Sequence, residues 1–151
     1  MIHRCSPAPT TTLVVVVTLI LSSCTASNGP DPAALEASAA ARILTVPATS
    51  PEKYRGLIDK KGWQNPYLII KTGGVALLDP ENHEERLLKP EELTQALGNL
   101  PASAWPYGRV VAVTENAVRA PGDDVSIRKN RALVNGTLDT LHVLVHWIPP
   151  A

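Results

Sequence analysis

A short apolar segment near the N-terminus, from Leu13 to Leu21, separates the first residues of this chain from everything that can fold. Thr18 is its only polar residue, and the small residues Ser22 and Ser23 end it. A helix needs about 20 apolar residues to cross the hydrocarbon core of a bilayer, so this segment is too short for a permanent span. Its length is typical of the apolar region of a secretory signal peptide, so we expect the fold to be built from later residues.

The end of this segment, Leu21-Ser22-Ser23-Cys24, is a large aliphatic residue, two small ones and a cysteine. This tetrad resembles the lipobox of bacterial lipoproteins. The resemblance implies a signal peptide over 1–23, cleavage before Cys24, and acyl chains such as palmitate on that cysteine. Each buried methylene contributes about 0.8 kcal/mol, so two or three acyl chains would hold a domain on a membrane. An ordinary secreted protein that is cut nearby is the alternative.

The same resemblance implies a location in the cell envelope, with the domain outside the cytoplasm. The residue after the cysteine is Thr25 rather than aspartate. By analogy with envelope lipoproteins, this indicates the periplasmic side of the outer membrane where the source has one. We expect 24–53 to hold the lipidated cysteine and a flexible tether, and 54–151 to form one small domain.

Composition excludes several classes of protein. Lys plus Arg and Asp plus Glu are each 14, so the formal net charge is zero and no overall field favours nucleic acid as a partner. Cys5 and Cys24 are the only cysteines, which leaves the domain without a disulfide or a thiol pair for a metal. We expect no cofactor, and a core built mainly from Val, Leu, Ile and Ala.

Within the tether, residues 31–42 are a candidate helix. Asp31 suits the N-cap and Pro32 suits the first helical position. Leu35 is the only large apolar residue before Ile43, so this helix has little to bury. We therefore expect a marginal helix inside a flexible segment.

The clearest strand signal is an apolar pattern over 66–78 that is interrupted by Gly73 and Gly74. It predicts a β-hairpin that turns at the glycines. A phosphate-binding loop is less consistent with the sequence, because no Lys-Ser or Lys-Thr pair follows. Residues 79–89 are rich in acids and predict a solvated connection, and His83 within them has no clustered partner for a metal.

A helix and a buried strand follow. Pro90 opens the helix, Leu93 and Leu97 repeat on one face, and Gly98 lies near its end. Residues 109–114 predict the strand. The loop between them, 101–108, carries two aromatic residues that are either a ligand platform or a lid over the edge of the core, Trp105 and Tyr107.

The last part of the chain predicts a helix and a strand. Asp123 or Asp124 can cap a helix whose apolar face continues to Leu141. Asn135-Gly136 leaves open a hairpin at that point instead. Residues 142–148 predict the closing strand.

Two histidines in this closing segment, His142 and His146, are the sharpest candidates for chemistry. Four residues apart on a helix they could share one zinc ion, whereas on a strand they lie about 13 Å apart at roughly 3.3 Å per residue. The intervening apolar residues favour a strand, so we expect no shared metal.

A group of charges around the turn into the last helix is the second candidate. Arg119 and Arg128 flank Asp123 and Asp124 there, where a helix N-terminus could receive an anion. The two aspartates would repel an anionic ligand, so capping and ion pairs are the simpler interpretation. Neither a nucleophile-elbow serine nor a carboxylate pair in an apolar pocket is evident, so the sequence identifies no catalytic residues.

The expected order, β-β-α-β-α-β, predicts an α+β two-layer sandwich with a mixed four-stranded sheet and two helices on one face. This layout resembles the periplasmic domain of TolR and ExbD over about 66–148. The strand 110–113, the helix capped at Asp123 and the closing strand carry the likeness. Those proteins have an uncut transmembrane helix with a proton-linked aspartate, so only a binding or dimerising role is implied here.

These observations favour a lipid-anchored cell-envelope protein whose small domain binds or scaffolds a partner, such as another envelope protein or a cell-wall polymer. The alternative is a small hydrolase or metal-dependent enzyme that uses His142 or His146. The residues that we expect to contact a partner are Trp105, Tyr107, Arg119 and Arg128.

Overall fold

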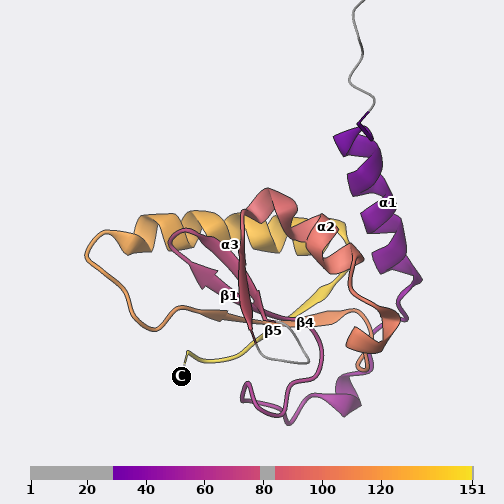
Figure 1. The fold of residues 1–151 in the computed structure, drawn as a ribbon. Coiled ribbons are helices and arrows are strands. Elements are labelled where there is room, and N and C mark those ends of the chain that lie inside the picture. Colours follow the sequence, from indigo (N-terminus) through magenta and orange to yellow (C-terminus); the bar gives the residue numbers. More distant parts are fainter. Residues whose placement is uncertain (1–28, 79–83, 151) are drawn as a thin grey trace, which may run out of the picture.

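The computed structural model describes residues 29–78 and 84–150, which form an α+β fold with one open, mixed sheet. Figure 1 shows the sheet with helices above it. The strands are β1 (Tyr67–Lys71), β2 (Gly74–Leu78), β3 (Glu85–Leu88), β4 (Val110–Glu115) and β5 (Leu144–Trp147). The helices are α1 (Pro32–Thr45), α2 (Leu93–Gly98) and α3 (Asp123–Thr140), and short 3-10 turns cover Pro51–Lys53, Pro90–Glu92 and Ala102–Ala104.

The strands lie in the order β3-β2-β1-β4-β5. β1 and β2 form the expected antiparallel hairpin, with Lys71 opposite Gly74 and the tight turn between them. β4 runs parallel to β1 on one side and to β5 on the other. The chain therefore crosses over between parallel neighbours, as the predicted helix connections require.

The prediction of four strands is wrong, because part of the acidic connection is the edge strand β3. It pairs antiparallel with β2, with Leu88 opposite Val75. Glu85 forms ion pairs with Lys71 and, at 3.9 Å, with Lys60. Only Leu88 of this strand is buried, and charged residues are common on edge strands, so its sequence has the composition of a loop.

The two faces of the sheet bury different sets of side chains. Alternate residues point to opposite faces of a strand, and those facing α2 and α3 form the larger core. This core includes Leu68, Ile70, Val75, Leu77, Val111, Val113, Leu93, Leu97, Ile127 and Val134. The opposite face is covered by the irregular segment 49–66, and its core includes Tyr54, Trp63, Tyr67, Ile69, Ala76, Val110, Ala112 and Ile148.

Helix α1 packs against α2, so the expectation of a marginal helix in a flexible tether is wrong for 32–45. Asp31 caps it as expected by accepting a hydrogen bond from the N–H of Ala33 at 3.1 Å. Ala39 and Ile43 are buried. Arg42 donates from Nε to the carbonyl of Gly98 at 2.7 Å, which ties the end of α1 to α2. Small residues make this contact, and they give a weak hydrophobic signal.

The other helices agree with the sequence in position and differ in one detail of capping. α2 ends at Gly98, and α3 continues through Asn135 and Gly136 without a break, so the alternative hairpin does not form. The N-cap of α3 is Gly122, with φ +94°, and not Asp123 or Asp124. Glycine adopts this left-handed backbone at little cost, and both aspartates then lie in the first helical turn, near the positive end of the helix dipole.

No helix within the described ranges, 29–78 and 84–150, has the length and apolar character needed to span a membrane. The tetrad Leu21–Cys24, which resembles a lipobox, and His83 lie outside these ranges.

Candidate functional site

A groove with a volume of about 470 Å³ lies on the sheet face opposite the helices. Its floor is built by three neighbouring strands or their ends: Tyr67 and Ile69 from β1, Thr114 from β4, and Ile148 just after β5. The pairing of Ile69 with Thr114 brings these side chains to the same face. Two loops, 58–60 and 116–118, form the walls. We call this feature the sheet groove.

Two hydroxyl groups lie in the apolar floor of the sheet groove. Thr114 is only 7% exposed, and its Oγ1 has no hydrogen-bond partner of normal geometry among the described residues. Burial raises the pKa of the Tyr67 phenol, and the neighbouring Thr114 hydroxyl offsets part of that rise. Buried polar atoms without partners are uncommon in native proteins, so the floor has an unused hydrogen-bonding capacity.

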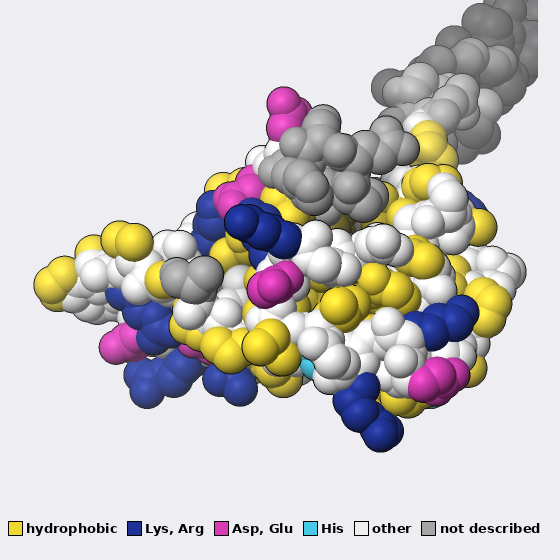
Figure 2. All heavy atoms as spheres, turned by 90° about the horizontal axis from the view of Figure 1, so that it is seen from below, with side chains coloured by type: hydrophobic (Ala, Val, Ile, Leu, Met, Phe, Trp, Pro, Cys, Tyr) yellow, Lys and Arg dark blue, Asp and Glu magenta, His cyan; other side chains and the backbone are white. Residues whose placement is uncertain are grey.

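The mouth of the sheet groove carries large apolar side chains that the fold leaves in solvent. Ile58 is 75% exposed and Val118 is 81% exposed. Figure 2 views this face from below and shows apolar side chains spread over its centre, with most lysines and arginines towards its margin. Apolar side chains around a concave site are typical of binding surfaces.

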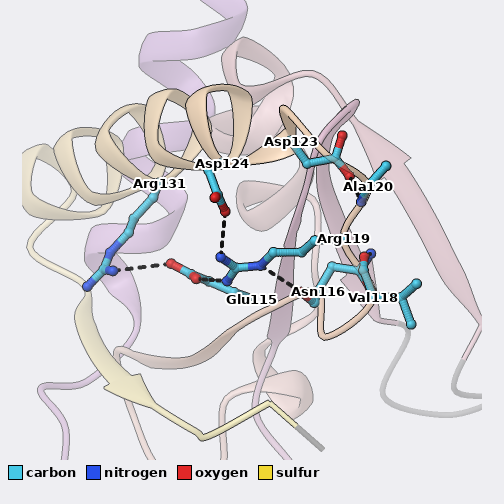
Figure 3. Close-up of polar contacts among 8 residues, drawn as sticks. All are labelled: Glu115, Asn116, Val118, Arg119, Ala120, Asp123, Asp124 and Arg131. Carbon is cyan, nitrogen blue, oxygen red and sulfur yellow. Dashed lines mark hydrogen bonds and ion pairs between the residues drawn. The ribbon is translucent and has the colours of Figure 1, made fainter.

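An ion-pair network lies at one wall of the groove (Figure 3). The Glu115 carboxylate accepts hydrogen bonds from Arg119 and, at 3.1 Å, from Arg131. Arg119 also donates to Asp124 at 3.0 Å, on the first turn of α3. Asp124 and then Glu115 raise the pKa of the Arg119 guanidinium. The network ties the loop after β4 to α3 and pairs the carboxylate of Glu115 at the end of β4.

The second candidate surface is the free edge of β5. The N–H of Leu144 donates to the carbonyl of Arg109 at 3.0 Å, and the N–H of Ile148 donates to that of Val113 at 2.9 Å. The backbone N–H and C=O groups of the even-numbered residues therefore point towards β4, and those of Val145 and Trp147 point away from the sheet. No strand of the described chain covers this edge.

Side chains on β5 add apolar area to this edge, and the neighbouring helix α3 adds one unpaired polar atom. Leu144 is 53% exposed, and the Trp147 ring lies 4.4 Å from the Arg131 guanidinium carbon. A groove of about 500 Å³ runs between β5 and α3. The Oδ1 atom of Asn135, which lines it, is buried without a hydrogen-bond partner among the described residues.

The histidines do not converge. His142 precedes β5 in a left-handed backbone conformation, with φ 53°, and is exposed. His146 lies on the strand, and its Nε2 is 2.9 Å from the carbonyl oxygen of Leu57. It also stacks on Trp63 and meets Tyr54 edge to face. The His146 side chain thus holds the segment 54–63 against the sheet.

The predicted aromatic pair is also separated. Trp105 is buried in the core on the helix side, and Tyr107 is buried on the opposite face. Because the sheet lies between these two cores, the pair does not form an exposed ligand platform. Both side chains close the core, which agrees with the interpretation as a lid.

The two predicted arginines behave differently from each other. Arg119 is committed to the network with Glu115 and Asp124. Arg128 is exposed on α3 and belongs to no ion pair in the described part of the chain. Asp123 accepts a hydrogen bond from the N–H of Ala120 at 2.7 Å. Asp123 is thus held by a hydrogen bond within the loop and Asp124 by an ion pair, in line with the expected ion pairs but not with capping of the helix.

The residues of the sheet groove do not stand out in the sequence. Tyr67, Ile69 and Thr114 were visible only as parts of strands, and Ile58 and Val118 lie outside any helix or strand pattern. Thr114 did offer a signal, since it places a hydroxyl directly after the apolar run Val110–Val113. The sequence could not show that three strands and two loops come together at this groove.

Comparison with protein-family models, with curated proteins and with solved structures finds no match to this chain. In the described ranges, no group of three or more His, Cys, Asp or Glu side chains is placed to hold a metal ion.

Proposed function

We propose that this chain is a lipid-anchored module of the cell envelope that binds a protein partner by strand addition at the edge of β5. The observation that carries the binding part is the row of outward backbone groups at Val145 and Trp147, next to the exposed side chain of Leu144. The Leu21–Cys24 tetrad supports the anchor.

Strand addition uses the backbone for affinity and side-chain pockets for specificity. An extended partner segment would pair with the N–H and C=O groups of Val145 and Trp147. Its side chains would contact Leu144 and enter the groove of about 500 Å³ beside α3, where Asn135 has an unpaired oxygen.

The two edges of the sheet differ in how open they are to such a partner. β3 carries Glu85 and Arg86, and Glu85 is paired with Lys71. β5 holds no lysine, proline or acid within its span, Leu144–Trp147. Charges and proline are the usual means of preventing edge pairing, so β5 is the edge that favours a partner.

The proposed anchor would hold the domain close to the membrane. α1 begins at Pro32 and is part of the folded body, so only the residues between it and Cys24 remain as a connection. A fully extended chain spans at most about 3.6 Å per residue, which limits this connection to about 29 Å. A partner would therefore be reached near the bilayer surface.

Nothing in the described residues around His142 or His146 favours the alternative of a hydrolase or metal-dependent enzyme. His146 is occupied by Leu57 and two aromatic rings, and His142 faces solvent. We therefore retain the binding role as the proposal.

The test is site-specific photo-crosslinking in intact cells, with a photoreactive residue at Leu144. The matched control is the same residue at Leu87, which is 58% exposed on the opposite edge strand, against 53% for Leu144. We expect a protein adduct of one defined mass from position 144 and not from position 87. Val145→Pro should abolish it, because proline removes an outward N–H without removing a bond to β4.

Repeated absence of an adduct, or the same adducts from both positions, would contradict strand addition at this edge. An adduct of twice the mass of the chain would assign the edge to a second copy instead. Metabolic labelling with an alkyne fatty acid tests the anchor separately, since Cys24→Ala should remove the label.

A further inference from the structure

The sheet groove has features of a site for a small molecule that the proposed protein partner does not use. It lies on the sheet face opposite the helices, whereas the groove beside β5 is lined by α3. Its volume of about 470 Å³ falls within the range of about 300–1,000 Å³ that is usual for small-molecule sites.

The charged side chains at the groove are already engaged in contacts within the protein. Glu115 is paired with Arg119 and Arg131, and Asp59 accepts a hydrogen bond from the N–H of Gly62 at 2.9 Å. Lys60 lies 3.9 Å from Glu85. A charged ligand would lose its hydration in this mostly apolar groove, where Lys60 and Glu115 are already paired, so the lining favours an uncharged ligand.

The Thr114 hydroxyl in the floor predicts that the ligand carries one hydrogen-bonding group. Thr114 Oγ1 is buried in the floor, its contact with the Tyr67 hydroxyl falls short of normal hydrogen-bond geometry, and its register neighbour Ile69 offers only apolar surface. A ligand hydroxyl, carbonyl or N–H that reached Thr114 would satisfy a group that the fold leaves unpaired. The Tyr67 hydroxyl lines the same floor.

The exposed side chains at the mouth fit the apolar part of such a ligand. Ile58 and Val118 project from the two opposite wall loops and are among the most exposed large apolar residues described. Contact with a bound apolar body would remove both from water.

From these observations we propose that the sheet groove binds a small uncharged amphiphile, with its apolar body between Ile58 and Val118 and its single hydrogen-bonding group on Thr114. The groove is lined by none of the β5 residues Leu144–Trp147, and either proposal can fail without the other.

The test uses N-phenyl-1-naphthylamine, an uncharged apolar probe with one N–H, whose fluorescence rises in apolar surroundings. Titrated into the full-length chain, it should bind with saturable, one-to-one stoichiometry. Val118→Glu places a charge at the mouth and should weaken binding by about tenfold or more. The matched control is Val125→Glu on α3, which changes an exposed valine outside the groove and should leave binding unchanged.

Thr114→Val tests the hydrogen bond. Valine retains the shape of threonine and removes an unpaired hydroxyl, so the thermal midpoint should stay the same or rise. Probe affinity should fall by about three- to tenfold, the value of one hydrogen bond.

Two results would overturn the proposal. The first is binding that is not saturable, or that Val118→Glu and Val125→Glu affect equally, since the probe would then not occupy the groove. The second is unchanged affinity in Thr114→Val, since the hydroxyl would then make no contact with the ligand.

Discussion

The imidazole of His146 stacks on the indole of Trp63, with ring centroids 5.2 Å apart and planes inclined by 3°. The two residues come from the last strand and from the irregular segment that precedes the first. Because a carbonyl oxygen only accepts hydrogen bonds, the 2.9 Å contact between His146 Nε2 and the carbonyl of Leu57 requires the proton on Nε2. This pairing positions one wall of the sheet groove, since Ile58 follows Leu57 directly.

His146→Ala should therefore loosen the segment 54–63. The substitution removes the stacked ring and leaves the Leu57 carbonyl without its donor, at a cost of about 2 kcal/mol in the free energy of unfolding. Urea denaturation measures this loss, and hydrogen exchange should show faster exchange across 54–63. His142→Asn is the control, because asparagine tolerates the left-handed backbone and the His142 side chain is exposed. Equal losses in both variants would contradict this role.

Local patterns were sufficient to predict most elements of the fold. The hairpin at Gly73-Gly74, the helix after Pro90 and the strand near Val110 all follow from periodicity and turn residues, which act over a few neighbours. The edge strand β3 was not predicted because its pairing with β2 depends on tertiary contacts, while it has only four residues and begins with the charged pair Glu85-Arg86.

The candidate sites could not be predicted in the same way. The sheet groove joins residues from about 58 to 149, and the contact between His146 and Leu57 spans 89 positions. A local sequence pattern carries no information about contacts between residues that are so far apart in the chain. The packing of α1 against α2 was missed for a different reason. Alanine and glycine allow this close contact because they are small, and small residues give little hydrophobic signal in the sequence.

Stability should depend on Tyr67 at alkaline pH. Burial raises the pKa of this phenol above its ordinary value of 10.0, so the unfolded chain loses the proton at a lower pH than the folded one. The contribution of the protonated Tyr67 phenol to the free energy of unfolding is complete below pH 10. It is lost as the pH rises through the pKa of Tyr67 in the folded protein. The difference in unfolding free energy between the wild type and Tyr67→Phe should thus be constant up to pH 10 and then shift against the wild type. A difference that stays constant to higher pH would contradict the raised pKa.

The Glu115 network should contribute stability that depends on salt. Glu115→Gln removes the carboxylate between Arg119 and Arg131 and leaves two cations close together. We expect a lower thermal midpoint at about 0.05 M salt, and a smaller difference from the wild type at about 1 M, where charges are screened within about 3 Å. Arg128→Gln, outside the network, should change the midpoint little at either salt concentration. A loss that salt does not reduce would point to packing instead.

Docking of α1 on α2 should depend on the absence of a side chain at Gly98. A Cβ atom there would lie 2.6 Å from the carbonyl oxygen of Ala39 and 2.8 Å from its Cα, and a backbone cannot yield as a flexible side chain does. Gly98→Ala should therefore destabilise the fold by about 1–3 kcal/mol and increase hydrogen exchange in α1. Gly136→Ala, in a helix with nothing within 4 Å of the added atom, should stabilise by about 0.5–1 kcal/mol. If both variants gained stability, α1 would not be held at this contact.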